Sequence, residues 1–182
     1  MTTELAAPGS RTTAPAPSPT ALTPSDPRLD AWRSFVQAHA RLTRRLDEEL
    51  QAGHGLSLAE YDALLQLVNA PGRRLRMSAL ADRVLLSRSG ITRLVDRLVA
   101  DGMVERTTCT TDARGAEAAL TTAGLDRLRA ASTTHLDGVR RLFLDVVTAE
   151  EREVLGSALN RVLDNVGRAP DAGDCAPVPE TV

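Results

Sequence analysis

The sequence predicts a mainly α-helical fold with one small β-hairpin, and three observations support this. Aromatic residues make up only 2% of the 182 residues, whereas Leu, Ala and Val recur at three- and four-residue steps, as on the buried face of a helix. Helix-capping residues stand directly before several of these segments. The hydrophobic content of 42% is sufficient for the core of one domain of ordinary size.

The first two helices each have a start signal and a stop signal. Asp26-Pro27 combines a capping carboxylate with a proline at the first helical position, and the helix should end at Gly53-His54-Gly55. Ser57 and Glu60 have the spacing of a capping box, in which each side chain accepts a backbone N–H of the other residue. This second helix should end at Ala70-Pro71-Gly72, because proline and glycine interrupt a helix.

Two short helices and a hairpin are expected next. Ser78 is the predicted cap of the helix in MSALADRV, Leu85-Leu86 forms a tight connection, and Ser87 caps a second helix that continues to residue 100. The following segment, MVERTTCTTDARGAEAALT, begins with β-favouring residues, has a polar tip around Asp112 and returns to Leu120-Thr121. We expect two strands joined at this tip.

Two long helices should complete the folded region. Thr122 is the expected cap of a helix that reaches Val147, and Thr148 with Glu151 forms a capping box for the last helix. Both helices carry long apolar stripes: Leu136, Val139, Leu142, Phe143, Val146, Val154, Leu155, Leu159, Val162 and Leu163. A small domain cannot cover such stripes internally, so a two-fold symmetric dimer is expected to bury them.

The ends of the chain and its cysteines exclude several classes of protein. Residues 1–26 are rich in Thr, Ala, Pro and Ser with almost no large apolar side chains, and residues 169–182 have the same character, so we expect a disordered arm and tail. Because no signal peptide or membrane-spanning segment is present, we expect a cytoplasmic protein. Cys109 and Cys175 lack the CxxC spacing of metal sites, and we predict no disulfide, metal or cofactor.

The helix over 88–100 has one apolar face and one face of short polar and arginine side chains. Ile91, Leu94, Val95, Leu98 and Val99 lie on the first face, and Ser89, Thr92, Arg93, Asp96 and Arg97 lie on the second. A short helix, a tight turn and a second helix of this kind form a helix-turn-helix, whose second helix enters the major groove of DNA. Small hydroxyls permit close approach, and arginine can contact guanine or phosphate.

Positive charge is concentrated around this motif. The segment 73–114 contains nine arginines and five acidic residues, whereas the whole chain has a net charge of -2. The hairpin would act as a wing that brings Arg106 and Arg114 beside the duplex. An ordinary solvated arginine face is the alternative interpretation.

The segment MSALADRVLLSRSGITRLVDRLVADGMVERTTCTTDARGAEAALTTAG resembles the winged helix-turn-helix core of the MarR family of bacterial transcription regulators. The most specific parts are TRLVDRL, the GMVER entry to the wing, and DARG followed by LT. The resemblance implies a homodimer that binds a palindromic double-stranded DNA operator, with repression as the expected outcome. The implied organisation is a DNA-binding domain at 57–121 and a helical dimerisation region at 27–56 and 122–168.

The resemblance also implies roles for individual residues. Groove and phosphate contacts are expected from Ser87, Arg88, Ser89, Thr92 and Arg93 in the helix, with Arg97 and Arg106 beside them. Arg114 would enter the minor groove, and Asp112 would position the wing. Where many relatives have a second basic residue on the returning strand, this chain has Gly115, Ala116 and Glu117, so Arg114 should carry more of the wing's contacts.

Members of the family commonly release DNA when an effector binds, often a small anionic or phenolic compound. By analogy, Trp32, Phe35, His39 and Tyr61 are candidate pocket residues, although rings at helical spacing more often fill a core or a dimer interface. Cys109, at the expected wing tip near Arg106, is a candidate redox switch, which is a second possible mode of regulation.

The sequence argues against an enzyme. It contains no glycine-rich phosphate loop, HExxH or GxSxG motif, and its three histidines are scattered, so no catalytic residues are assigned. A winged-helix module that binds only protein partners through its basic face remains the alternative. Steep salt dependence, which phosphate binding produces, would distinguish DNA binding from that alternative.

Overall fold

The computed structural model describes residues 22–108 and 116–167, and the chain divides into two units between Ala38 and His39. The first unit contains a 3-10 turn, η1 (Pro27–Leu29), and the beginning of helix α1 (Asp30–His54). As the sequence predicts, Asp26 caps this start, since its carboxylate accepts the Arg28 N–H at 2.9 Å. The expected arm and tail lie outside the described residues, apart from 22–26.

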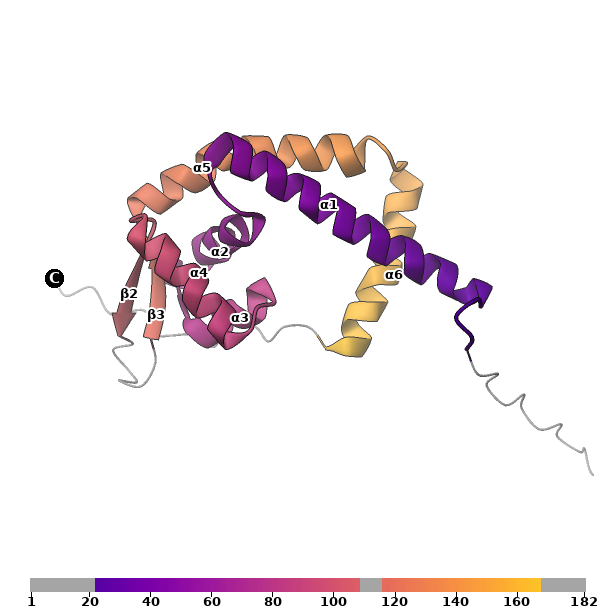
Figure 1. Ribbon diagram of the computed structural model, residues 1–182, viewed down its shortest axis with the longest axis horizontal. Helices are drawn as coiled ribbons and strands as arrows, with labels where there is room; N and C mark the ends of the chain where they lie inside the picture. The colour runs from indigo at the N-terminus through magenta and orange to yellow at the C-terminus, as the bar shows by residue number, and fades with distance from the viewer. Residues whose placement is uncertain (1–21, 109–115, 168–182) are drawn as a thin grey trace, which may run out of the picture. The chain divides into compact units, whose positions relative to one another are not determined.

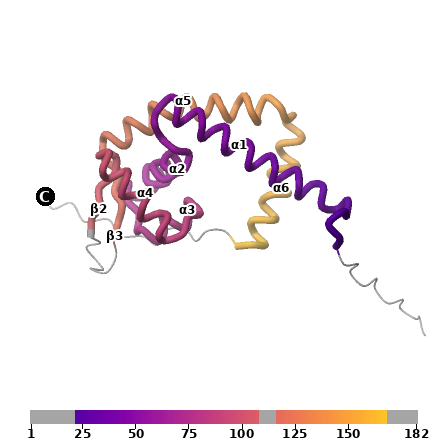
Figure 2. Tube along the Cα trace, viewed as in Figure 1, coloured from indigo at the N-terminus to yellow at the C-terminus, as the bar shows by residue number. Residues whose placement is uncertain are grey.

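The second unit holds the remainder of α1 and all the later elements (Figures 1 and 2). The later elements are α2 (Leu58–Val68), η2 (Pro71–Arg73), β1 (Arg74–Arg76), α3 (Met77–Val84), α4 (Arg88–Ala100), β2 (Val104–Thr108), β3 (Ala116–Leu120), α5 (Thr122–Val139), the π-helical turn η3 (Arg140–Leu144) and α6 (Ala149–Val166). The fold is therefore mainly helical with a small sheet, which confirms the predicted fold class.

The sheet has three antiparallel strands in the order β1-β3-β2. The hairpin of β2 and β3 was expected, and its register places Val104 opposite Leu120 and Thr108 opposite Ala116. Strand β1 was not expected, because three residues are too few to show an alternating pattern. Figure 1 shows β2 and β3 side by side with α4 next to them.

One core joins the sheet to the helices around it. Fully buried leucines and valines come from α1, α2, α3, α4 and β2: Leu50, Leu64, Leu67, Leu80, Val95, Leu98 and Val104. Gly124 at the start of α5 permits close packing, because a Cβ there would lie 2.1 Å from the Met103 carbonyl oxygen. Helix α6 contributes no buried residue.

The structure corrects three predicted boundaries. Helix α3 begins at Met77 after Arg76, so Ser78 is inside the helix and is not its cap, because the pairing of β1 continues to the residue before the helix. The cap of α5 is Thr121 and not Thr122, since Thr121 Oγ1 accepts the Gly124 N–H at 3.0 Å. The helix expected to reach Val147 changes to π-helical hydrogen bonding after Val139.

Candidate nucleic-acid interface

Helices α3 and α4 are joined by the tight turn that a helix-turn-helix requires. Leu85 adopts the left-handed conformation with φ of 57°, and the Leu86 N–H donates to the Ala81 carbonyl at 2.9 Å. Ser87 then begins α4, because its hydroxyl accepts the Gly90 N–H at 3.1 Å. The predicted cap of this helix is confirmed.

Helix α4 divides into the two faces that its sequence predicts. Ile91, Leu94, Val95 and Leu98 are buried, whereas Arg88, Ser89, Thr92, Arg93, Asp96 and Arg97 are exposed. Val99, expected on the apolar face, is 38% exposed. A polar surface with three arginines therefore runs along the outside of the helix.

Two of the exposed arginines have no ion-pair partner in the described part of the chain. Arg88 and Arg93 belong to the first two turns of α4, the part of a recognition helix that contacts base edges in a helix-turn-helix. Around them, the Ser89 hydroxyl lies 3.3 Å from that of Ser87, and the Thr92 hydroxyl donates to the Arg88 carbonyl at 2.8 Å. The free guanidinium groups can therefore turn toward a ligand.

Arg97, by contrast, is held by Glu60 of α2. Its Nε lies 2.8 Å from Glu60 Oε1, and the Glu60 side chain is only 11% exposed. The other carboxylate oxygen of Glu60 accepts the Ser57 N–H at 2.9 Å in the predicted capping box. Burial opposes ionisation of Glu60, but the Ser57 N–H and the Arg97 guanidinium outweigh it and hold the pKa of this carboxyl below its ordinary value.

Arg106 of β2 also contacts α4. Its Nη2 lies 2.9 Å from the Asp96 carboxylate and 3.3 Å from the Thr92 carbonyl oxygen. Sequence reasoning found Arg97 and Arg106 as candidate DNA contacts but missed Glu60 and Asp96 as their partners. The sequence shows Asp96 inside the motif and Glu60 in the capping box of the preceding helix, but it does not indicate which arginine either acid meets.

The wing tip lies outside the described residues, and with it Cys109, Asp112 and Arg114. Below the tip, Thr107 of β2 faces Glu117 of β3 in the register of the sheet, and Glu117 is buried.

The four candidate pocket residues do not lie in similar surroundings. In the first unit, Trp32 and Phe35 are 61% and 43% exposed, with ring centroids 6.1 Å apart. His39 is exposed, whereas Tyr61 is buried, with its ring 4.4 Å from that of His135 and its hydroxyl 3.3 Å from Ser132 Oγ. Tyr61 is therefore part of the core between α2 and α5.

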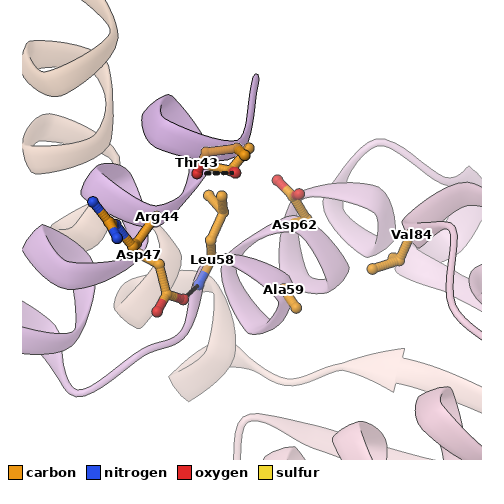
Figure 3. A pocket seen from close by; sticks show the side chains of 8 residues that line it. Thr43, Arg44, Asp47, Leu58, Ala59, Asp62 and Val84 are labelled. Atoms are coloured by element: carbon orange, nitrogen blue, oxygen red, sulfur yellow. Dashed lines mark hydrogen bonds between the residues drawn. The ribbon is translucent and has the colours of Figure 1, made fainter. Parts of the chain in front are cut away.

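A surface cavity of about 390 Å³, open to solvent, lies elsewhere, between the part of α1 that follows His39, the start of α2 and the end of α3 (Figure 3). Its lining is Ala40, Thr43, Arg44, Asp47, Leu58, Ala59, Asp62 and Val84. Asp47 accepts the Leu58 N–H at 2.7 Å, as the dashed line in Figure 3 indicates. Burial raises the pKa of Asp62, and nearby His135 opposes this rise, while burial lowers the pKa of His135.

Two further properties concern the described residues only. Within 22–108 and 116–167, no three His, Cys, Asp or Glu side chains are grouped so that they could hold a metal ion. No helix in these ranges combines the length and the apolar character needed to cross a membrane.

Comparison with known proteins gives consistent matches. Residues 54–115 match the model of the MarR family. The curated relative YetL of Bacillus subtilis, described as an HTH-type transcriptional repressor, is 30% identical over 119 residues, which cover 65% of this chain and 71% of YetL.

Solved structures agree with this match. One match is Sco3205 of Streptomyces coelicolor, a MarR family transcriptional regulator crystallised in complex with DNA. It is 34% identical to this chain with a TM-score of 0.75, and the match covers 85% of this chain and 95% of Sco3205. AbsC of the same organism, another MarR family regulator, is 32% identical with a TM-score of 0.74, covering 80% of this chain and 98% of AbsC.

Proposed function

This chain belongs to the MarR family of winged helix-turn-helix, DNA-binding transcription regulators, and from that premise we propose that it binds a palindromic operator as a homodimer and represses transcription. The observation that carries the proposal is the outer face of α4, where Arg88 and Arg93 are exposed without an ion-pair partner among the described residues. Repression is supported by the similarity to YetL, which is described as a repressor.

The proposed DNA contacts are exposed polar residues at the start of α4 and on its outer face: Ser87, Arg88, Ser89, Thr92 and Arg93. Arg93 is the proposed base reader, because an arginine can bond guanine O6 and N7 together in the major groove. Arg114 is proposed to enter the minor groove, with Asp112 positioning the wing. Arg97 and Arg106 are not in this set, because their guanidinium groups already have acidic partners.

Dimerisation is proposed for the regions 27–56 and 122–168, with the DNA-binding domain at 57–121. The support is the apolar surface of the C-terminal region, where Val146, before α6, is 71% exposed and Val154 and Val166, in α6, are 71% and 69% exposed. Helix α6 buries no residue of its own, so a second chain is the simplest cover for its apolar stripe. A two-fold dimer also matches the symmetry of a palindrome.

The cavity beside α2 is the proposed effector site. Asp47 and Asp62 outnumber the single guanidinium of Arg44, so the lining favours a small organic cation over the anionic or phenolic compound expected from the family. Val84 ends α3 and directly precedes the turn into α4, so a bound ligand would bias the position of α4. Benzylamine and benzoate, which are similar in size and opposite in charge, are suitable probes: only benzylamine should raise the melting temperature and weaken DNA binding.

Selection of bound duplexes from a random pool, at two salt concentrations, tests the main proposal. Enrichment of a palindrome with half-sites about one helical turn apart, with affinity that falls steeply as salt rises, is the expected result. Weak binding without enrichment would reject sequence-specific DNA binding and favour a protein partner for the basic face. Sedimentation of the free protein provides the separate test of the dimer.

A further inference from the structure

Two ion pairs connect the recognition helix to its neighbours, one on each side of its polar face. On one flank Glu60 of α2 holds Arg97, and on the other Arg106 of β2 holds Asp96. At 100° per residue, Arg97 and Asp96 lie on opposite sides of Arg93, the exposed arginine in the middle of the polar face. The two pairs therefore leave Arg93 between them and restrict rotation of α4 about its own axis.

The Glu60–Arg97 pair is the more deeply buried of the two at its carboxylate. Glu60 is 8% exposed and uses both carboxylate oxygens, one for the Ser57 N–H at 2.9 Å and one for Arg97 Nε at 2.8 Å. Since the first contact fixes the carboxylate to the backbone at the start of α2, the second fixes Arg97 to the same point. Arg97 Nη1 also lies 3.5 Å from the Arg93 carbonyl oxygen, so the guanidinium lies along its own helix.

We propose that Glu60 is a specificity-determining positioning residue, which acts through Arg97 to set the orientation of α4 and to keep the Arg97 charge away from DNA phosphate. This rests on the proposed function, because it presumes that Arg93 reads bases from α4. An unpaired Arg97 would lie four residues from Arg93, on the same side of the helix, and would add a phosphate contact that carries no sequence information. Glu60 thus lowers affinity for random DNA and preserves base readout.

The matched test uses two glutamates at the same capping-box position. Glu60→Gln removes the charge that faces Arg97 but keeps a side chain suited to the capping box. Glu151→Gln makes the same change in the capping box of α6, where Glu151 contacts Thr148 and pairs with no arginine within residues 22–108 and 116–167. Both full-length variants are titrated with a duplex carrying the palindrome selected by the wild type, and with a duplex of the same composition in shuffled order.

Glu60→Gln should bind shuffled DNA more tightly than the wild type does, and the ratio of its affinities for palindrome and shuffled DNA should fall about tenfold. The slope of the logarithm of the binding constant against the logarithm of the salt concentration, called the salt slope below, should be steeper by about 1. Glu151→Gln should leave the ratio and the slope at wild-type values. An unchanged ratio and slope in Glu60→Gln, with the wild type still selecting its palindrome, would overturn the inference and leave the proposed function intact. If the wild type selects no palindrome, both fail.

Arg97→Gln provides a second variant that does not depend on the folding of Glu60→Gln. Without Arg97, α4 loses its ion pair with Glu60, and no unpaired arginine is left to contact phosphate. The ratio of palindrome to shuffled affinity should therefore fall, while the salt slope remains at the wild-type value. A slope shallower by about 1 would mean that Arg97 already neutralises a phosphate in the wild type, which contradicts the proposal. Thermal unfolding of each variant confirms that folded protein is being compared.

Discussion

The guanidinium of Arg106 on β2 lies 2.9 Å from the carboxylate of Asp96 on α4. The strand that leads into the wing is therefore tied to the recognition helix. Both side chains are partly exposed, at 39% and 55%, so water screens the pair and its direct contribution to folding is small. Its position matters more than its strength, because it connects the two elements proposed to meet the major and minor grooves.

Arg106 should contribute little to stability and nothing to DNA binding. Because its charge is already paired with Asp96, Arg106→Gln should reduce the free energy of unfolding by only about 0.2–1 kcal/mol and leave the salt dependence of DNA binding unchanged. Chemical denaturation and titration at several salt concentrations measure the two quantities. A salt slope shallower by about 1 would instead identify Arg106 as a phosphate contact, as the sequence alone indicated.

Arg93 should behave in the opposite way. Arg93→Ala is expected to cost about 1–3 kcal/mol of binding to the selected palindrome and much less on shuffled DNA, if Arg93 forms two hydrogen bonds to guanine. Arg93→Lys keeps the charge but lacks the planar pair of donors, so it should recover binding to shuffled DNA and not specificity. Equal losses on both duplexes in Arg93→Ala would rule out base readout by this residue.

The sequence predicted which arginines are exposed on α4, but it did not predict which of them have an acidic partner. The Ser57–Glu60 and Thr148–Glu151 capping boxes both form, because each needs only four consecutive residues. The single caps predicted at Ser78 and Thr122 were wrong, because one polar residue does not fix where a helix begins. The partner of Arg97 is 37 positions away, and only the packing of α2 against α4 brings Glu60 to it.

The sequence also did not predict strand β1 or the cavity, and the reason is the same for both. Three residues, Arg74–Arg76, become β1 because β3 offers them an edge for pairing, and that edge exists only in the folded protein. The cavity likewise combines residues from three helices, and a sequence does not show which residues of different helices will meet. Tyr61, one of the candidate pocket residues, packs against His135 in the core.

The turn between α3 and α4 provides a prediction about stability. Leu85 has φ of 57° and is 85% exposed, so its side chain contributes little packing while its Cβ disfavours this conformation. Leu85→Gly should leave the free energy of unfolding unchanged or raise it by up to about 1 kcal/mol, since relief of strain exceeds or balances the greater entropy of an unfolded glycine. Leu85→Ala, which keeps the Cβ, should fall within about 0.5 kcal/mol of the wild type. A loss of more than about 1 kcal/mol in Leu85→Gly would show that the leucine side chain makes a stabilising contact.

Two helical glycines should respond oppositely to alanine. Gly124→Ala would put a Cβ 2.1 Å from the Met103 carbonyl oxygen, so α5 must shift, and we expect a loss of about 1–3 kcal/mol or more. Gly156→Ala, in α6, meets no other described residue of its own chain within 4 Å. It should gain about 0.5–1 kcal/mol from helix propensity if position 156 lies outside the proposed dimer contact. Thermal unfolding of the two variants compares them directly. Similar effects in both would contradict the close packing of α5 on the residue that precedes β2.

The last prediction follows from the raised pKa of Asp62. Burial is the main cause of the rise above the ordinary value of 3.8, and the charge of His135 opposes it. A carboxyl whose pKa is higher in the folded state ionises more readily in the unfolded state, so ionised Asp62 lowers stability at neutral pH. The penalty disappears as the pH falls below 3.8, where the carboxyl is protonated in both states.

Asp62→Asn should therefore raise the melting temperature at about pH 7 and have little effect at about pH 3, because the neutral amide resembles the protonated acid. Asp82→Asn removes one carboxylate from the exposed surface of α3 and serves as the control for the loss of a negative charge. If a cation occupies the cavity, benzylamine should lose its stabilising effect in Asp62→Asn and retain it in Asp82→Asn. A destabilised Asp62→Asn at neutral pH would mean that the ionised carboxylate has a favourable partner, and it would remove the reason for expecting a cationic effector there.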